Sequence, residues 1–319
     1  MNSATSRAAL ALAMLGLVGG SIAWYWRALD RFPDDFTPPL DAAKTARLGG
    51  PVRVGGWGGG GGGVRRTPVV FVHGTTGAAW NFGAARLLFR LWGYKPDEMW
   101  ALTYGWGGAL HVDPNGVETR DDSVDENLAD LDGFVTSVLA YVQQRNPAIT
   151  QVDIVGHSMG GVLARKWMQT YGTARLVRSL VTLDSPHHGV DPVALRNMRC
   201  PDAPTRFCED FAAGSAWLAD LNAPPEVPPG VRALTVYDGT DKISFLGTPL
   251  SPRLEGADNI AYNLERGARV THVAYVYDPG VLRVVFDWLQ GARYTSSAAS
   301  ASSSVSFGTT GLSKGAGRN

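Results

Sequence analysis

A serine flanked by glycines, between a strand pattern and a helix pattern, is the feature that most restricts how this chain can fold. Residues 156–160 read Gly-His-Ser-Met-Gly, and they follow the apolar run at 152–155 and precede apolar residues at helical spacing over 162–168. Glycine on both sides removes the Cβ atoms that would collide where the chain turns back on itself. This context predicts a nucleophile elbow, a strand-to-helix turn that exposes the hydroxyl of Ser158 at the carboxyl edge of a sheet.

Strand patterns and helix patterns alternate on both sides of this turn. Short apolar runs predict strands at 68–72, 99–104, 152–155, 180–183, 231–237 and 270–272, and periodic patterns predict helices at 79–94, 128–142, 162–168 and 280–290. Ser123 and Glu126 form a capping box at the start of the second helix. Such alternation predicts an α/β fold, with a parallel sheet covered by helices on both faces and ligands at the carboxyl ends of its strands.

The two ends of the chain have the composition of segments outside the folded domain. Residues 1–26 hold a basic residue, an apolar run and small residues, which predict a secretory signal peptide. The run continues through aromatic residues to nearly the length of a membrane span, so an uncleaved anchor is the alternative, and both imply export. We expect a flexible linker over 27–66, because its glycine tract disfavours helix and strand, a folded catalytic domain over 67–293 and a disordered Ser- and Gly-rich tail over 294–319.

Charge and cysteine content exclude some partners. The formal net charge is zero and 18% of residues are charged, so the chain lacks the basic stripe that nucleic-acid binding needs. Cys200 and Cys208 are the only cysteines, and in an oxidising compartment we expect them to form a disulfide that closes a short loop. Further metal ligands are missing near them, so we expect no metal site there.

A serine nucleophile needs a histidine base. Three histidines follow Ser158, as the order serine, acid, histidine requires, and of these His272 lies after the last predicted strand and before the last helix. His272 is therefore the expected base, and we expect His187 and His188 to shape the wall of the cleft.

The acid has three candidates. Asp184 ends one predicted strand, whereas Asp238 and Asp241 follow the next. Asp241 is favoured, because it lies far enough beyond its strand to reach His272, and Asp238 is then expected to cap the turn.

The reaction also needs donors for a developing oxyanion. The loop 73–77 after the first predicted strand contains two glycines that permit close approach. We expect the backbone N–H groups of Thr75 and Met159 to form this oxyanion hole.

At this point the motifs resemble a known family. The segments 68–82, 152–161, 180–189, 236–241 and 271–272 together are similar to the class 2 lipases, including the small lidless bacterial lipases. The resemblance covers about 68–290 and implies a minimal α/β-hydrolase fold and carboxylic-ester hydrolysis without a cofactor. It implies the roles given above to Ser158, His272, Thr75 and Met159, and it favours Asp241 over Asp238 as the acid.

The segment 185–230 is longer than in the smallest members of that family. Two interpretations stay open, a lid or acyl-pocket wall and a loop packed on the sheet edge. Under the first, the expected substrate contacts are Phe211, Trp217 and Leu218, together with His73 and His157 beside the elbow.

The resulting expectation is an exported serine hydrolase that cleaves lipid-like esters through an acyl-enzyme on Ser158, with a lipid or other ester as its partner and lipid-surface association as an option. The alternatives of the same chemistry are a polyester depolymerase, a thioesterase or an acyltransferase. A non-catalytic binding protein on a hydrolase fold is the alternative of another class.

Overall fold

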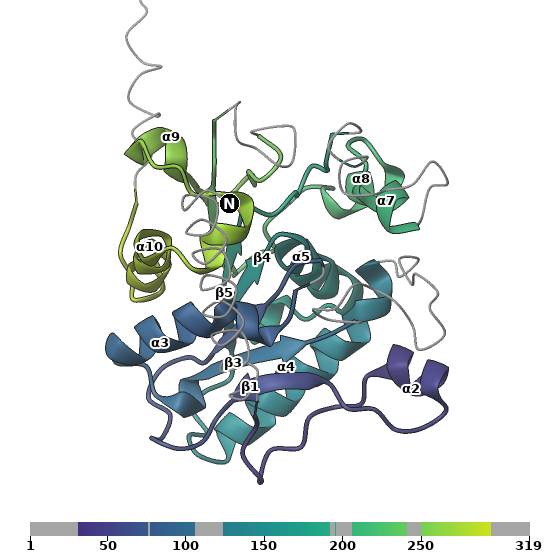
Figure 1. Ribbon diagram of the computed structural model, residues 1–319, viewed down its shortest axis with the longest axis vertical. Helices are drawn as coiled ribbons and strands as arrows, with labels where there is room; N and C mark the ends of the chain where they lie inside the picture. Colours follow the sequence, from purple (N-terminus) through teal and green to yellow (C-terminus); the bar gives the residue numbers. More distant parts are fainter. Residues whose placement is uncertain are drawn as a thin grey trace, which may run out of the picture.

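A mostly parallel β-sheet forms the centre of the computed structural model, which describes residues 31–75, 77–105, 124–191, 195, 206–240 and 250–294 (Figure 1). Within these ranges the sheet has seven strands in the order β1-β3-β2-β4-β5-β6-β7. The strands are β1 (Gly55–Gly58), β2 (Val69–Val72), β3 (Met99–Thr103), β4 (Val152–His157), β5 (Val177–Leu183), β6 (Arg232–Tyr237) and β7 (Asp258–Ala261). Only β1 runs antiparallel to its neighbour. The predicted α/β fold is confirmed.

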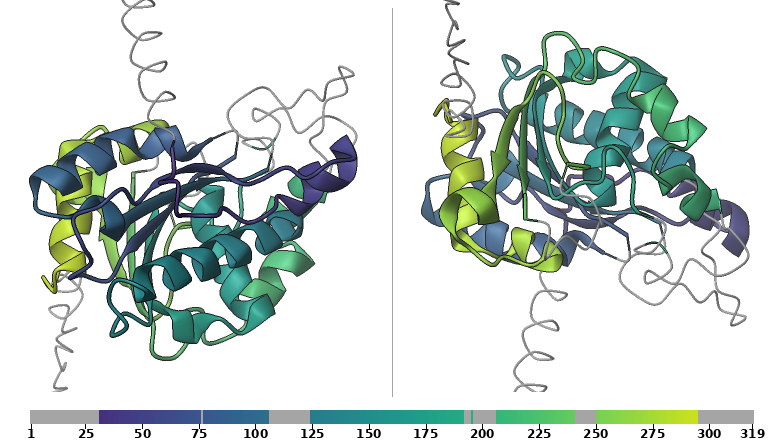
Figure 2. Two further views of the ribbon diagram at one scale, coloured as in Figure 1. Left: turned by 90° about the horizontal axis from the view of Figure 1, so that it is seen from below. Right: turned by 90° about the horizontal axis from the view of Figure 1, so that it is seen from above.

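Helices cover both faces of this sheet, as Figure 2 shows most clearly in its left view. The helices described are α2 (Ala42–Leu48), α3 (Gly83–Leu91), α4 (Leu128–Gln143), α5 (Met159–Tyr171), α7 (Arg206–Phe211), α8 (Ala216–Leu221), α9 (Tyr262–Arg266) and α10 (Pro279–Leu289). Helices α3 and α10 pack on one face, and α4 and α5 pack on the other.

The side chains of β2 explain why helices must cover both faces of the sheet. Val69 and Phe71 belong to the core under α3 and α10, whereas Val70 and Val72 belong to the core under α4 and α5. All four side chains are fully buried. Successive strand residues point to opposite faces, so an uninterrupted apolar run is stable only when both faces are covered.

The glycine tract was predicted to be a linker unable to hold a strand, and this is wrong for Gly55–Gly58, which forms β1 beside β3. Trp57 anchors the strand, because its ring is buried and its Nε1 donates a hydrogen bond to the carbonyl of Ala79 (2.8 Å). Glycine is required here, since a Cβ on Gly56 would lie 2.1 Å from the carbonyl oxygen of Ala101. Burial of one indole and strand pairing outweigh the backbone entropy that glycine loses.

The predicted strand over 270–272 is also wrong. His272 instead begins a short 3-10 helix, η5 (His272–Val276), and the sheet ends with β7. The reason is that the side chain of Asn263 bonds both backbone groups of Val270, donating to its carbonyl (2.8 Å) and accepting from its N–H (2.9 Å). These groups are thus satisfied without a sheet partner.

Several predictions fall outside the described residues. They concern the signal peptide or anchor, the tail beyond residue 294, Ser123 of the capping box, and Cys200 of the expected disulfide. In the part of the chain that the structure describes, every helix is too short or too polar to cross a membrane.

Candidate active site

The elbow is a sharp turn between β4 and α5. Ser158 has φ 53° and ψ −126°, and its N–H donates to the carbonyl of Leu183 at the end of β5 (2.9 Å). A Cβ on Gly156 would lie 2.5 Å from the N atom of Gly161, and one on Gly160 would lie 2.2 Å from the carbonyl oxygen of Val72. The flanking glycines therefore let the helix pack directly against the strands, as the motif predicts.

His272 lies beside the serine, at the start of η5. Its Nε2 is 2.9 Å from the Oγ of Ser158, and its Nδ1 is 2.7 Å from the Oδ2 of Asp184. A carboxylate only accepts, so Nδ1 carries the proton and Nε2 is the acceptor for the serine hydroxyl. The structure thus brings Ser158 and His272 together as the sequence predicts.

The carboxylate in this chain comes from the end of β5. Asp184 is 2% exposed, has φ 46°, and donates its N–H to the carbonyl of Val236 on β6 (2.8 Å). Among the described residues, Ser158 and Asp184 are the two with positive φ that are not glycine. Backbone strain of this kind is concentrated at functional sites, and here it falls on two hydrogen-bond partners of His272.

This arrangement differs from the expectation for Asp241. Asp241 lies outside the described residues. The hydrogen-bond partner of Nδ1 of His272, which was predicted to be Asp241, is Asp184. The physical reason is the strand order, because β5 is paired directly with β4 and so its end lies next to the elbow. Asp238 is buried and accepts from the Oγ1 of Thr240 (2.6 Å), which agrees with its expected role in the turn.

The loop after β2 lies against the serine. A Cβ on Gly74 would lie 2.7 Å from the Cβ of Ser158 and 3.2 Å from its Oγ. The Oγ1 of Thr75 donates to the Sδ of Met159 (3.5 Å), so the two residues expected to form the oxyanion hole are in contact. Met159 is the first residue of α5, where an N–H has no carbonyl partner within its own helix. The geometry is compatible with an oxyanion hole at this point.

His73, whose contact with substrate stays a prediction, supports this loop. It is 3% exposed, its Nδ1 donates to the carbonyl of Gly74 (2.7 Å), and its Nε2 accepts from the N–H of Tyr104 (3.2 Å). The ring of Tyr104 stacks on it at 4.1 Å, and the Tyr104 hydroxyl donates to the carbonyl of His73. Sequence reasoning missed Tyr104, although its position just beyond β3 places it at the carboxyl edge of the sheet.

His157 contacts the backbone of His272. Its Nε2 donates to the carbonyl of His272 (2.8 Å), and the two rings are 4.9 Å apart. Burial, with a smaller contribution from the neighbouring His272, lowers the pKa of His157 to about 3. His157 is therefore neutral in ordinary buffers and fixes the backbone of His272.

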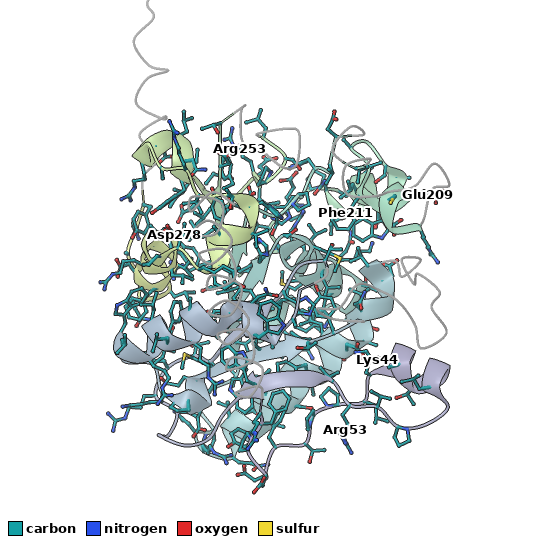
Figure 3. The ribbon with its side chains drawn as sticks, in the orientation of Figure 1. Lys44, Arg53, Glu209, Phe211, Arg253 and Asp278 are labelled. Carbon is teal, nitrogen blue, oxygen red and sulfur yellow. The ribbon has the colours of Figure 1, made fainter. Side chains whose placement is uncertain are left out.

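The other expected substrate contacts pack into the core beside α5. Phe211 and Leu218 are each 2% exposed, and Trp217 stacks on Phe211 at 6.1 Å (Figure 3 labels Phe211). Their contact with substrate stays a prediction.

A buried arginine that the sequence analysis missed fixes this part of the chain. Arg165 on α5 donates to the carbonyls of Leu221 and Glu226 (both 3.2 Å) and to the Oδ1 of Asn222 (2.8 Å). The described part of 206–230 is thus attached to the elbow helix. This favours the interpretation of a packed loop for these residues.

A strained serine at a strand-to-helix turn, with a histidine and a carboxylate from neighbouring strand ends, defines an α/β hydrolase. Within the described residues, no group of three or more histidine, cysteine or acidic side chains is placed to hold a metal ion. The family model for class 2 lipases matches residues 66–247. That match covers more than half of the chain, and the chain belongs to the class 2 lipase family.

Solved structures support the fold. The mature form of the lipase BlEst2 from Bacillus licheniformis is 16% identical, with a TM-score of 0.51, over 70% of this chain and 92% of that one. Lipase B from Aspergillus fumigatus is 17% identical, with a TM-score of 0.54, over 83% of this chain and 56% of that longer one. These likenesses show a shared α/β-hydrolase fold, and family membership makes the protein a carboxylic ester hydrolase that acts on lipid esters.

Proposed function

We propose that the protein hydrolyses lipid esters through an acyl-enzyme on Ser158, with His272 as base and Asp184 as the acid that orients it. The observation that carries this proposal is the pair of hydrogen bonds at His272, 2.9 Å to Ser158 and 2.7 Å to Asp184. These distances suit proton transfer from the hydroxyl to the imidazole and stabilisation of the resulting imidazolium.

The reaction then follows in two stages. Ser158 attacks the ester carbonyl while His272 takes its proton, and the alcohol leaves with that proton. Water next attacks the acyl-enzyme, His272 takes and returns the second proton, and the carboxylic acid leaves. The N–H groups of Thr75 and Met159 are proposed to stabilise the oxyanion, and one such donor typically contributes about 3 to 4 kcal/mol.

The conformational strain at the site argues against a binding protein without catalytic activity. Positive φ at a residue other than glycine costs roughly 1 to 3 kcal/mol, and both Ser158 and Asp184 have it. Strain of this kind is expected where it serves chemistry.

We further propose that the protein is exported and works at a lipid surface, with Cys200 and Cys208 joined. The support is the apolar N-terminal run and the spacing of the cysteines. Mass spectrometry under non-reducing conditions would detect the disulfide, and N-terminal sequencing of the mature protein would distinguish cleavage from anchoring.

The central experiment measures hydrolysis of nitrophenyl esters from short to long acyl chains by the full chain. Ser158→Ala should abolish turnover and labelling by a fluorophosphonate, whereas Ser137→Ala on α4 should retain both. Turnover of long chains would support a lipase, and turnover of short chains alone would indicate an esterase. Substantial turnover by Ser158→Ala, with a normal thermal unfolding curve, would sink the mechanism. Adding an alcohol or a thioester would reveal an acyltransferase or a thioesterase.

A further inference from the structure

An asparagine side chain joins the loop after β2 to the segment that carries His272. Asn81 lies in the 3-10 helix η1 (Ala79–Phe82), which follows this loop. Its Nδ2 donates to the hydroxyl of Tyr277 (3.0 Å), 196 residues further along the chain. Tyr277 directly follows η5, the short helix that His272 begins. The contact therefore connects two segments of the active site that are distant in sequence.

The oxygen of the same carboxamide shapes the loop. The Oδ1 of Asn81 accepts from the backbone N–H of Ala78 (2.6 Å), and a Cβ on Gly77 would lie 2.9 Å from this oxygen. The N–H of Gly77 in turn donates to the carbonyl of Gly74 (3.0 Å) and closes the turn that contains Thr75. An amide oxygen can only accept, so the bond to Ala78 fixes which end of the carboxamide donates to the other segment.

The helix that holds Asn81 is fixed to the sheet. The N–H of Ala79 donates to the Oγ1 of Thr103 at the end of β3 (2.9 Å), and the carbonyl of Ala79 accepts from the Nε1 of Trp57 on β1 (2.8 Å). Phe82, at the other end of η1, is fully buried in the core under α3 and α10. Asn81 therefore extends from a rigid support.

The segment around Tyr277 is anchored as well. Tyr275 and Val276 are buried in the same core. The residue after Tyr277 is Asp278, and its side chain caps the start of α10 by accepting from the N–H of Val281 (2.9 Å). The hydrogen bond from Asn81 thus joins two rigid elements, and it restricts the spacing between them.

Given the proposed acyl-enzyme reaction, we propose that Asn81 and Tyr277 are positioning residues. Together they hold the backbone N–H of Thr75 at a fixed distance from His272. An oxyanion donor is effective only about 2.7–3.1 Å from the developing charge, and a displacement of about 1 Å can slow a reaction roughly 10²-fold. The base and this donor are on different segments, so a change in the spacing raises the barrier to chemistry more than it weakens binding of a small substrate.

The test uses Tyr277→Phe, which removes the hydroxyl and keeps the ring. The side chain of Tyr277 is 38% exposed, so this change leaves the core intact. The matched control is Tyr171→Phe, at an exposed tyrosine that ends α5 far from the elbow. Asn81→Ala and the double variant Asn81→Ala/Tyr277→Phe complete a cycle that isolates the hydrogen bond. Each full-length protein is assayed on a short soluble nitrophenyl ester, below the unfolding temperature of the least stable variant.

We expect kcat to fall about three- to tenfold in Tyr277→Phe, with KM changed by less than about twofold. Asn81→Ala should lose more, because the N–H of Ala78 also loses its acceptor. The double variant should be no slower than Asn81→Ala, since the hydroxyl has already lost its partner. The affinity for an alkylboronic acid, which forms a tetrahedral adduct with the hydroxyl of Ser158, should fall in parallel with kcat.

Unchanged kcat and unchanged boronic-acid affinity in Tyr277→Phe would overturn the positioning role. Losses that multiply in the double variant, or a change in KM alone, would overturn it too. Ser158→Ala separates this result from the reaction itself. If that variant is inactive, the acyl-enzyme reaction stands whatever the result at Tyr277, whereas turnover by Ser158→Ala would overturn both proposals.

Discussion

Ser158 and Asp184 share an unusual backbone conformation, and each ends a strand of the sheet. In both residues a polar side chain is directed toward His272 from a position with left-handed φ. The cost of these conformations is offset by backbone hydrogen bonds to the neighbouring strand, from Ser158 to Leu183 and from Asp184 to Val236. At the scale of single residues, the proposed chemistry therefore depends on geometry that the sheet enforces.

The first prediction concerns the acid. Asp184→Asn should lower kcat by about 10⁴-fold, because the amide no longer stabilises the imidazolium or its tautomer. Asp241→Asn should lower it much less. Steady-state kinetics on one soluble ester checks both, and the reverse ranking would restore Asp241 as the acid.

The second prediction concerns pH. The folded pKa of His157 is lowered to about 3, so its folded form stays neutral while the unfolded form binds a proton below about 6.5. Folding stability should therefore fall as pH decreases from about 6.5 toward 3, since the unfolded state binds more protons. Urea unfolding at about pH 7 and at about pH 5 gives the free energy of unfolding at each pH. Between the two, this free energy should decrease by about 1–2 kcal/mol less in His157→Gln than in the natural protein. Identical losses would show that His157 is protonated in the fold.

At the scale of elements, the loop after β2 and the helix α5 meet at the serine. Gly74 approaches Ser158 from the loop, and Met159 begins the helix on its other side. His73 and Tyr104 hold the loop from behind, while burial raises the pKa of Tyr104 and keeps its hydroxyl protonated. Rigid support of this kind is what oxyanion stabilisation requires.

The third prediction tests that approach. Gly74→Ala would place a methyl group 2.7 Å from the Cβ of Ser158, so either the loop or the nucleophile must move. We expect kcat to fall about 10²-fold or more, with a smaller change in unfolding temperature. Gly172→Ala, at a helix end far from the serine, is a control for glycine replacement. Normal turnover in Gly74→Ala would mean that this loop does not contact the reacting group.

The fourth prediction concerns the attachment of 221–226 to α5. Arg165→Met should destabilise the fold by about 2–4 kcal/mol, because three hydrogen bonds from a buried guanidinium are lost. Arg175→Met, at an exposed position with one weak hydrogen bond, should change stability by less than about 0.5 kcal/mol. Chemical denaturation measures the free energy of unfolding of both variants. Equal decreases in the two would contradict the proposed attachment.

For the whole molecule, local patterns predict most of the sheet and the contact between His272 and Ser158. The parallel strands and the elbow were readable because apolar runs and glycine positions reflect local sterics. The pairing of His272 with Ser158 followed from chain order. The hydrogen bond between Asp184 and His272 was not predicted, because it depends on which strand end lies beside the elbow, and the pairing order of strands is not a local property of the sequence.

Two edge strands were missed for a related reason. β1 is mostly glycine and β7 contains Asp258 and Asn259, so neither has the composition of a strand. Their stability comes from tertiary contacts, the buried ring of Trp57 in one case and the hydrogen bond from Thr235 to Asn259 (2.9 Å) in the other. Such contacts join residues that sequence reasoning cannot bring together.

The hydrogen bonds that the backbone N–H groups of Ser158 and Asp184 donate determine when the active site can form during synthesis. Each residue is fixed by the strand that follows it in the chain, Ser158 by the end of β5 and Asp184 by β6. A chain emerging during synthesis therefore presents the serine early but acquires the acid's correct conformation only when β6 has paired, and the base arrives later still. Newly made protein would thus be inactive toward esters until its sheet is nearly complete. In a refolding experiment, the recovery of activity would therefore measure the last stage of folding.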